Sequence, residues 1–178
     1  ARRGLPNLKT MVDAIPSLVS EKTISLFERQ HVLNEVELRA RAEIHYELYS
    51  KALNIEAKTM IEMASRKYIP AVIRFTKGLA DSINSVKSAV PEADVSVQTE
   101  LLVKTSSLLA EAKAALKDLQ ACVVEAAGKE EGREAAEYFK DVVFPTMARL
   151  RAPIDELEML VDKEVWPVPT YADLLFEV

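Results

Sequence analysis

The stretch "LLVKTSSLLAEAKAALKDLQACVVEAA", residues 101–127, decides the fold class. Nothing in it interrupts a helix, because it contains neither Gly nor Pro. Apolar and small side chains recur in it at alternating spacings of three and four residues, at Leu102, Thr105, Leu109, Ala112, Leu116, Leu119, Val123 and Ala126. This spacing lines them up on one side of an α-helix and is typical of a coiled-coil seam. We therefore predict a long helix over residues 95–127 that packs against other helices.

Two further long helices are predicted, one on either side of this one. Helical periodicity runs from residue 34 to about residue 88, and again over residues 134–165. Short turns over residues 88–94 and 128–133 join the three helices, so neighbouring helices should run antiparallel. The predicted fold is all-α, an elongated antiparallel bundle of three long, Pro-kinked helices with short flanking helices.

Four prolines mark places where we expect helices to bend or stop. Pro70 should kink the first long helix without breaking it, because one apolar stripe continues through the proline. Pro145 and Pro153 should bend the last long helix. Near the N-terminus, Pro16 should stop a short helical turn at residues 8–14.

We expect one domain with three parts. Residues 1–33 should form a connector and a short helix that Ser20 caps, and residues 34–165 the long-helix bundle. Residues 166–178, "WPVPTYADLLFEV", form a Pro-rich tail with many apolar side chains. Because a frayed terminus is usually polar, this composition predicts that the tail docks on a surface.

The tail has two candidate docking places. Thr170 and Asp173 can cap one last helical turn in it. That turn could plug the end of the bundle near Val86, Val90 and Val95, or it could anchor the chain to a neighbouring surface. The periodicity does not decide between the two.

The first half of the helix over residues 34–88 is apolar on two sides. One line consists of Ile44, Leu48 and Ile55. A second line lies about a third of a turn or more away, and its members are Leu38, Ala42, Tyr46, Tyr49, Leu53 and Met60. A helix with two apolar sides is covered from both. The preceding short helix can cover one side, while the connector, another subunit or a further domain must cover the other.

These observations define a candidate interface. It combines the two-sided helix with the tail and consists of Ile44, Tyr46, Leu48, Tyr49, Trp166, Tyr171, Leu174 and Phe176. Within this set, Trp166 could stack on a ligand, but an aromatic ring in a Pro-rich tail is more typical of a packing anchor.

Charge and composition exclude several classes of protein. The net charge is −5, and residues 95–178 carry 9 basic against 16 acidic side chains, so no concentrated basic face for nucleic acid is expected. No apolar run approaches the ~18 residues that span a bilayer, and no signal peptide is visible. The sequence has a single cysteine, Cys122, whose side chain we expect to be partly buried. One cysteine cannot form a disulfide framework, so the expected compartment is a reducing cytoplasm. A start at Ala1 rather than Met suits a processed protein or an excised piece.

Residue types that carry catalysis are nearly absent. Four scattered Gly cannot build a phosphate loop. His31 and His45 are the only histidines, and Glu28-x-x-His31 is half of a di-iron bundle motif whose second half is missing. No Ser-His-Asp or Cys-His set can be assembled. We therefore predict no catalytic, cofactor-binding or metal-binding residue in this chain.

Four stretches carry a resemblance to a known family. They are "VSEKTISLFERQHVLNEVELRARAEIHYELYSKALNIEAKTMIEMA", "YIPAVIRFTKGLAD", "YFKDVVFPTMARLRAPIDELEMLV" and "WPVPTYADLLF". Together they resemble the C-terminal helical region of type III glutamine synthetases. The resemblance covers about residues 5–176 and is weakest through residues 95–128. Pro153 departs from the pattern, because a helix-compatible residue is expected there.

The resemblance implies a parent enzyme that ligates ammonia to glutamate through a γ-glutamyl phosphate, using ATP and Mg²⁺ or Mn²⁺. It also implies a ring-shaped homo-oligomer, in which the partners of this chain are its own upstream catalytic domain and neighbouring subunits. The catalytic residues would lie in that upstream domain, so the expected role of this chain is architectural.

Two alternatives come from other classes. The first is a free-standing helical coiled-coil scaffold without enzymatic activity. It could recruit partners through an acidic stripe that consists of Glu130, Glu134, Glu137 and Asp141. The other interpretation of this stripe is a solvated helix face. The second is a di-iron or other helical-bundle enzyme.

Overall fold

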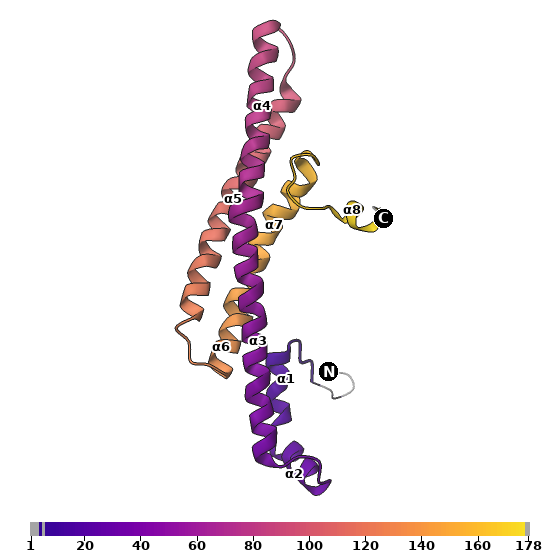
Figure 1. The fold of residues 1–178 in the computed structure, drawn as a ribbon, viewed down its shortest axis with the longest axis vertical. Helices are drawn as coiled ribbons and strands as arrows, with labels where there is room; N and C mark the ends of the chain where they lie inside the picture. The colour runs from indigo at the N-terminus through magenta and orange to yellow at the C-terminus, as the bar shows by residue number, and fades with distance from the viewer. Residues whose placement is uncertain (1–3, 5, 177–178) are drawn as a thin grey trace. The chain divides into compact units, whose positions relative to one another are not determined.

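The computed structural model describes residue 4 and residues 6–176, and this part of the chain is all-α (Figure 1). No strand occurs among these residues. The α-helices are α1 (Met11–Leu18), α2 (Glu21–Arg29), α3 (Glu35–Met63), α4 (Ile69–Ala89), α5 (Ser96–Ala126), α6 (Arg133–Tyr138), α7 (Phe144–Leu160) and α8 (Tyr171–Phe176). The predicted fold class is confirmed.

The chain divides into two compact units, each built from two separate segments of sequence. The first unit combines the described residues up to Lys58 with Cys122–Pro145. The second combines Thr59–Ala121 with the described residues from Thr146 onward. In the second unit, α4 and α5 form a helical hairpin (Figure 1). The three-part division of the sequence given above stays a prediction.

Helix α5 follows the seam that its sequence predicts. It begins at Ser96, whose N–H donates to the Asp94 carboxylate at 2.9 Å, and ends at Ala126. The buried positions follow the three-and-four spacing closely and are Thr105, Leu108, Ala112, Leu116, Leu119, Cys122, Val123 and Ala126. Thr105 satisfies its buried hydroxyl by donating to the Leu101 carbonyl at 2.7 Å. Cys122 is buried, as predicted.

Two π-helical segments carry the backbone past Pro70 and Pro145. The segment η1 (Ala64–Tyr68) ends two residues before Pro70, and η2 (Phe139–Val143) ends two residues before Pro145. The residue before each proline donates its N–H five residues back, from Ile69 to Ala64 and from Phe144 to Phe139. A proline has no N–H to donate and its ring clashes with the carbonyl four residues back, so the wider turn suits it. The predicted continuity through Pro70 is confirmed.

Pro16 does not stop the first helix, which corrects the prediction. Helix α1 contains Pro16 and continues to Leu18. It begins later than predicted, because the Thr10 hydroxyl accepts the Asp13 N–H at 3.2 Å and so caps the first turn. The loss of one backbone donor is tolerated in a short helix whose apolar side is buried.

Helix α7 also differs from the prediction, because it ends earlier than expected. Pro153 is buried inside α7, and the helix continues through it. However, α7 ends at Leu160, five residues before the predicted end at residue 165. The backbone turns there because the N–H groups of Val165 and Trp166 both donate to the Asp162 carbonyl at 2.9 Å.

Candidate interaction surfaces

One side of α3 is covered by its own chain. In the first unit, Ala42 and Tyr46 of α3 form a buried cluster with Val12 and Ile15 of α1 and Ala136 of α6. The line of α3 that supplies these contacts is the second apolar line of the sequence, and its buried members are Leu38, Ala42, Tyr46 and Leu53. This side will be called the covered side of α3. Helix α1, which lies in the N-terminal connector, therefore provides much of the cover.

The other apolar line of α3 lies on the surface of the chain. Ile44 is 51% exposed, Leu48 56% and Ile55 66%. At 100° per residue these three positions lie about half a turn from Tyr46 and Leu53. This set will be called the exposed line of α3. Single exposed apolar residues are ordinary, but three on one helix face form a continuous strip.

Local hydrogen bonds fix where α3 begins. The Asn34 N–H donates to the Glu37 carboxylate at 2.8 Å, and the Glu37 N–H donates to the Asn34 side-chain oxygen at 2.9 Å. This reciprocal arrangement is a capping box, as the sequence N-x-x-E indicates. The Glu35 N–H donates to Glu28 at 3.2 Å and ties α2 to the same helix start.

An ion pair joins α1 to η2, next to the covered side of α3. The Lys140 ammonium donates to the Asp13 carboxylate at 2.7 Å, and the Thr10 hydroxyl donates to the same group, also at 2.7 Å. The Lys140 hydrogen bond, followed by that of Thr10, lowers the pKa of Asp13, and the hydrogen bond with Asp13 raises the pKa of Lys140. Burial raises the pKa of Tyr46 and of Tyr49, which packs against the same cluster.

The tail packs against its own unit. The rings of Trp166 and Tyr68 stack with centroids 5.1 Å apart and planes 17° apart. The tail thus docks within its own unit. Figure 1 places it away from the α4–α5 turn, so it does not form the plug predicted as one alternative near Val86, Val90 and Val95. Trp166 is 7% exposed, and its Nε1 is buried without a hydrogen-bond partner among the described residues.

A cap predicted from the sequence fixes the last helix. Thr170 donates its N–H to the Asp173 carboxylate at 2.8 Å, and the Asp173 N–H donates back to the Thr170 hydroxyl at 3.3 Å. Lys163 forms an ion pair with Asp173. The Lys163 hydrogen bond, followed by those of Thr170, lowers the pKa of Asp173 to about 2. This network ties the start of α8 to the turn that follows α7.

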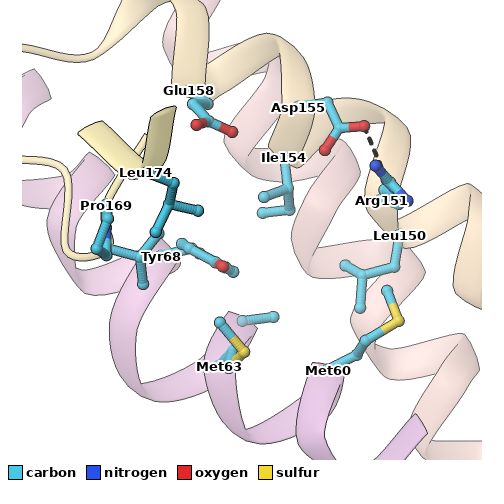
Figure 2. Close-up of a pocket in the computed structure, with 12 residues that line it drawn as sticks. Met60, Met63, Tyr68, Leu150, Arg151, Ile154, Asp155, Glu158, Pro169 and Leu174 are labelled. Carbon is cyan, nitrogen blue, oxygen red and sulfur yellow. Dashed lines mark hydrogen bonds and ion pairs between the residues drawn. The ribbon is translucent and has the colours of Figure 1, made fainter. Parts of the chain in front are cut away.

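The tail forms one wall of an apolar pocket of about 390 Å³ in the second unit (Figure 2). The end of α3 and η1 provide a second wall, and α7 provides the third. The lining side chains are mostly apolar and include Met60, Met63, Tyr68, Leu150, Ile154, Val168, Pro169 and Leu174. Arg151, Asp155 and Glu158 of α7 add charge to the lining.

The candidate interface residues fall into three groups. Ile44, Leu48 and Leu174 are exposed, the last at 70%. Tyr46 is 5% exposed and lies in the covered cluster with Tyr49 packed against it, while Trp166 is buried on Tyr68. The side chains of Tyr171 and Phe176 lie outside the described residues. The interface role of all eight residues stays a prediction, and among the described side chains it is Ile44, Leu48 and Leu174 that a partner could reach without displacing the chain's own contacts.

The acidic stripe is largely paired within the chain. Glu134 lies 4.0 Å from Lys129, and Glu137 lies 2.7 Å from Arg133. Asp141 lies 3.5 Å from Lys140. These contacts favour its interpretation as a solvated face over that of a docking strip.

Sequence comparison gives three relatives and one family. Residues 1–87 match the family described as glutamine synthetase C-terminal domain. The whole chain is 33% identical to 25% of the glutamine synthetase of Butyrivibrio fibrisolvens. It is 32% identical, over 98% of its length, to 24% of the type-3 glutamine synthetase of Dictyostelium discoideum. For the glutamine synthetase of Bacteroides fragilis, the identity is 28% over 99% of the chain and 25% of the relative.

Residues 1–87 thus match the glutamine synthetase C-terminal domain, and the whole chain is similar to a segment of each of these glutamine synthetases. The resemblance carried by the four quoted stretches is thus confirmed. The chain spans about a quarter of the length of these glutamine synthetases.

The described residues contain neither a cluster that could hold a metal ion nor a helix that could span a membrane. Among residues 4 and 6–176, no group of three or more His, Cys, Asp or Glu side chains could hold a metal ion. His31 lies just beyond α2 with a positive φ of 54°. In the same part of the chain, no helix has the length and apolar character to cross a membrane.

Proposed function

We propose that this chain is the non-catalytic, architectural C-terminal domain of a glutamine synthetase, and that the exposed line of α3 binds the rest of that enzyme. The parent would be a cytoplasmic, ring-shaped homo-oligomer that ligates ammonia to glutamate. Its ATP and Mg²⁺ or Mn²⁺ would bind in an upstream catalytic domain. The relatives support this proposal, because each is about four times as long as the matched segment.

The observation that carries the proposal is the contrast between the two sides of α3. The chain covers Leu38 completely, yet it leaves Ile44 and Leu48 more than half exposed one helical turn apart. Burying the exposed parts of these two side chains would contribute roughly 2–3 kcal/mol to an association. A surface of this kind is typical of an interface that the chain does not complete by itself.

The described residues do not fit the divalent cation that such an enzyme uses. Oxygen ligands for Mg²⁺ converge from several carboxylates or phosphates, and no such group occurs among the described residues. No step of the ligase reaction is therefore assigned to them, and the proposal is restricted to assembly.

A charge placed on the exposed line tests the proposal in the parent enzyme. We expect that Ile44→Asp combined with Leu48→Asp lowers the molar mass of the assembly in light scattering and lowers ligase activity with it. Val124→Asp provides a matched control, because Val124 is an exposed apolar residue of α5 in the same unit. Unchanged mass and activity in the double variant would contradict the proposal.

A mixing experiment distinguishes this proposal from the alternative that the chain is a free-standing scaffold. If the chain is part of the enzyme, it should co-elute with the cognate catalytic region in size-exclusion chromatography. A scaffold with other partners would elute alone.

A further inference from the structure

The apolar pocket of the second unit has the size and lining of a binding site. Its volume of about 390 Å³ lies within the usual range of ligand pockets, about 300–1,000 Å³. Two flexible thioethers, Met60 and Met63, face Ile154 across the opening in Figure 2. Methionine side chains adapt to the shape of what they contact, which suits a pocket that receives a side chain.

The charges of the pocket are unbalanced on the acidic side. Arg151 pairs with Asp155 at 3.0 Å, so these two groups largely neutralise each other. Glu158 is partly buried, yet within the described part of the chain it accepts no hydrogen bond and forms no ion pair. Burial, then the negative charges of Glu158 and Asp155, raise the pKa of the Tyr68 hydroxyl, which points into the same opening (Figure 2).

A partly desolvated carboxylate above an apolar floor is complementary to one kind of side chain. Lysine and arginine combine a long apolar stem with a cationic head. The stem would lie against Met60 and Ile154, while the head would reach Glu158 and the Tyr68 hydroxyl. A neutral apolar side chain would instead leave Glu158 buried without a compensating charge, which is unfavourable.

Exposed apolar side chains next to the pocket indicate a polypeptide rather than a small cation. Leu174 lines the pocket and is mostly exposed, and so are Leu175 beside it and Met159 beside Glu158. A small amine would fill the pocket and leave these side chains in water. A segment with apolar residues next to its basic residue would cover them as well.

We propose that this pocket binds a lysine or arginine side chain, flanked by apolar residues, from the remainder of the parent glutamine synthetase. The inference rests on the proposed function, because roughly three quarters of each relative lies outside the matched segment. It adds a second contact, of different chemistry, to the one proposed for the exposed line of α3.

Photo-crosslinking in the parent enzyme tests the proposal. We would place p-benzoylphenylalanine at Leu174, in the pocket wall, and at Val103, an exposed apolar residue of α5, as the control position. From position 174 we expect crosslinks to a peptide of the catalytic region that carries Lys or Arg beside apolar residues. Crosslinks to a peptide without a basic residue, to the same domain of another copy, or to nothing would overturn the proposal.

A charge reversal sharpens the test. Glu158→Lys should lower the crosslink yield from position 174 at least about tenfold, because like charges would then meet in a partly desolvated site. Glu158→Gln, which keeps the shape, should lower it less. Glu156→Lys is the matched control, because Glu156 lies exposed on the same helix and outside the pocket. An equal loss in the Glu156 variant would contradict a specific role of the pocket.

Measuring the molar mass of the same samples separates this inference from the proposed function. If the assembly and its dependence on Ile44 and Leu48 persist while the crosslinks from position 174 fail, only the pocket proposal is wrong. If substitutions on the exposed line have no effect, the proposed function is wrong, whatever the crosslinks show.

Discussion

The two apolar sides of α3 belong to one helix but have different surroundings. On the covered side, Tyr46 and Ala42 meet α1 and α6, and little of them reaches solvent. On the exposed line, Ile44 and Leu48 have the same apolar character and no such cover. The difference shows that hydrophobic periodicity reports which residues need burial and does not report whether the same chain provides it.

The largest expected effect comes from making the same substitution on both sides. Leu38→Ala removes a fully buried side chain and should lower the free energy of unfolding by about 2–5 kcal/mol. Leu48→Ala, at a mostly exposed position, should change it by less than about 0.5 kcal/mol. Urea unfolding of the isolated chain, followed by far-ultraviolet circular dichroism, measures both. Equal losses in the two variants would mean that the exposed line is covered within the chain.

A smaller effect is expected at the turn that leads into α6, which supplies Ala136 to the covered side. Gly132 has a φ of +93°, and a Cβ there would lie 2.7 Å from the Glu43 carboxylate. The Glu43 carboxylate can move aside at the end of its flexible side chain, but an L side chain rarely adopts this φ, so Gly132→Ala should destabilise the chain by about 1–3 kcal/mol. The control is Gly78→Ala inside α4, where no atom beyond the neighbouring residues and the helix's own backbone lies within 4 Å of the added Cβ. That variant should be more stable than the wild type, by about 0.5–1 kcal/mol, and thermal unfolding would show opposite shifts for the two.

The smallest expected effect is the pH dependence of the Asp13–Lys140 pair, which joins α1 to η2 next to the covered side. The pKa of Asp13 is lowered from 3.8, so its contribution is complete above that pH and is lost as the pH falls through the lowered value. The pKa of Lys140 is raised from 10.5, so its contribution is complete below that pH and is lost as the pH rises through the raised value. The stability difference between wild type and Lys140→Met should thus be constant between about pH 4 and 10 and shrink outside that range. A difference that does not change with pH would contradict an ionic role of the pair.

Much of the fold follows from local patterns that a sequence displays directly. The α5 seam is buried almost as predicted, with Leu108 buried in place of Leu109, because a helix repeats every 3.6 residues whatever surrounds it. The caps at Asn34 and Thr170 also form as predicted, since they need only residues three positions apart.

The deviations arise where distant parts of the chain or backbone geometry decide. The π-helical segments before Pro70 and Pro145 reflect how a backbone relieves a proline clash, which residue spacing does not show. Pro16 lies inside α1 because Val12 and Ile15 are buried against α3 and α6.

The candidate site could be predicted only in part. Sequence periodicity identified both apolar lines of α3, but the choice of covered line depends on where α1 and α6 dock. The pocket was missed, because in the sequence Met60 is an ordinary member of the second apolar line and Ile154 an ordinary apolar residue of the last predicted helix. Its signal, the acidic Glu158 directly after the buried Leu157 of α7, becomes apparent only when the tail forms the third wall.

The most direct test of the central claim compares side-chain accessibility before and after assembly. Hydroxyl-radical footprinting would be performed on the isolated chain and on the parent enzyme, with Leu38 as the buried reference. We predict that Leu48 and Ile44 are readily labelled in the isolated chain and become protected in the parent enzyme, while Leu38 is protected in both. Equal labelling of Leu48 and Ile44 in the two samples would contradict the account.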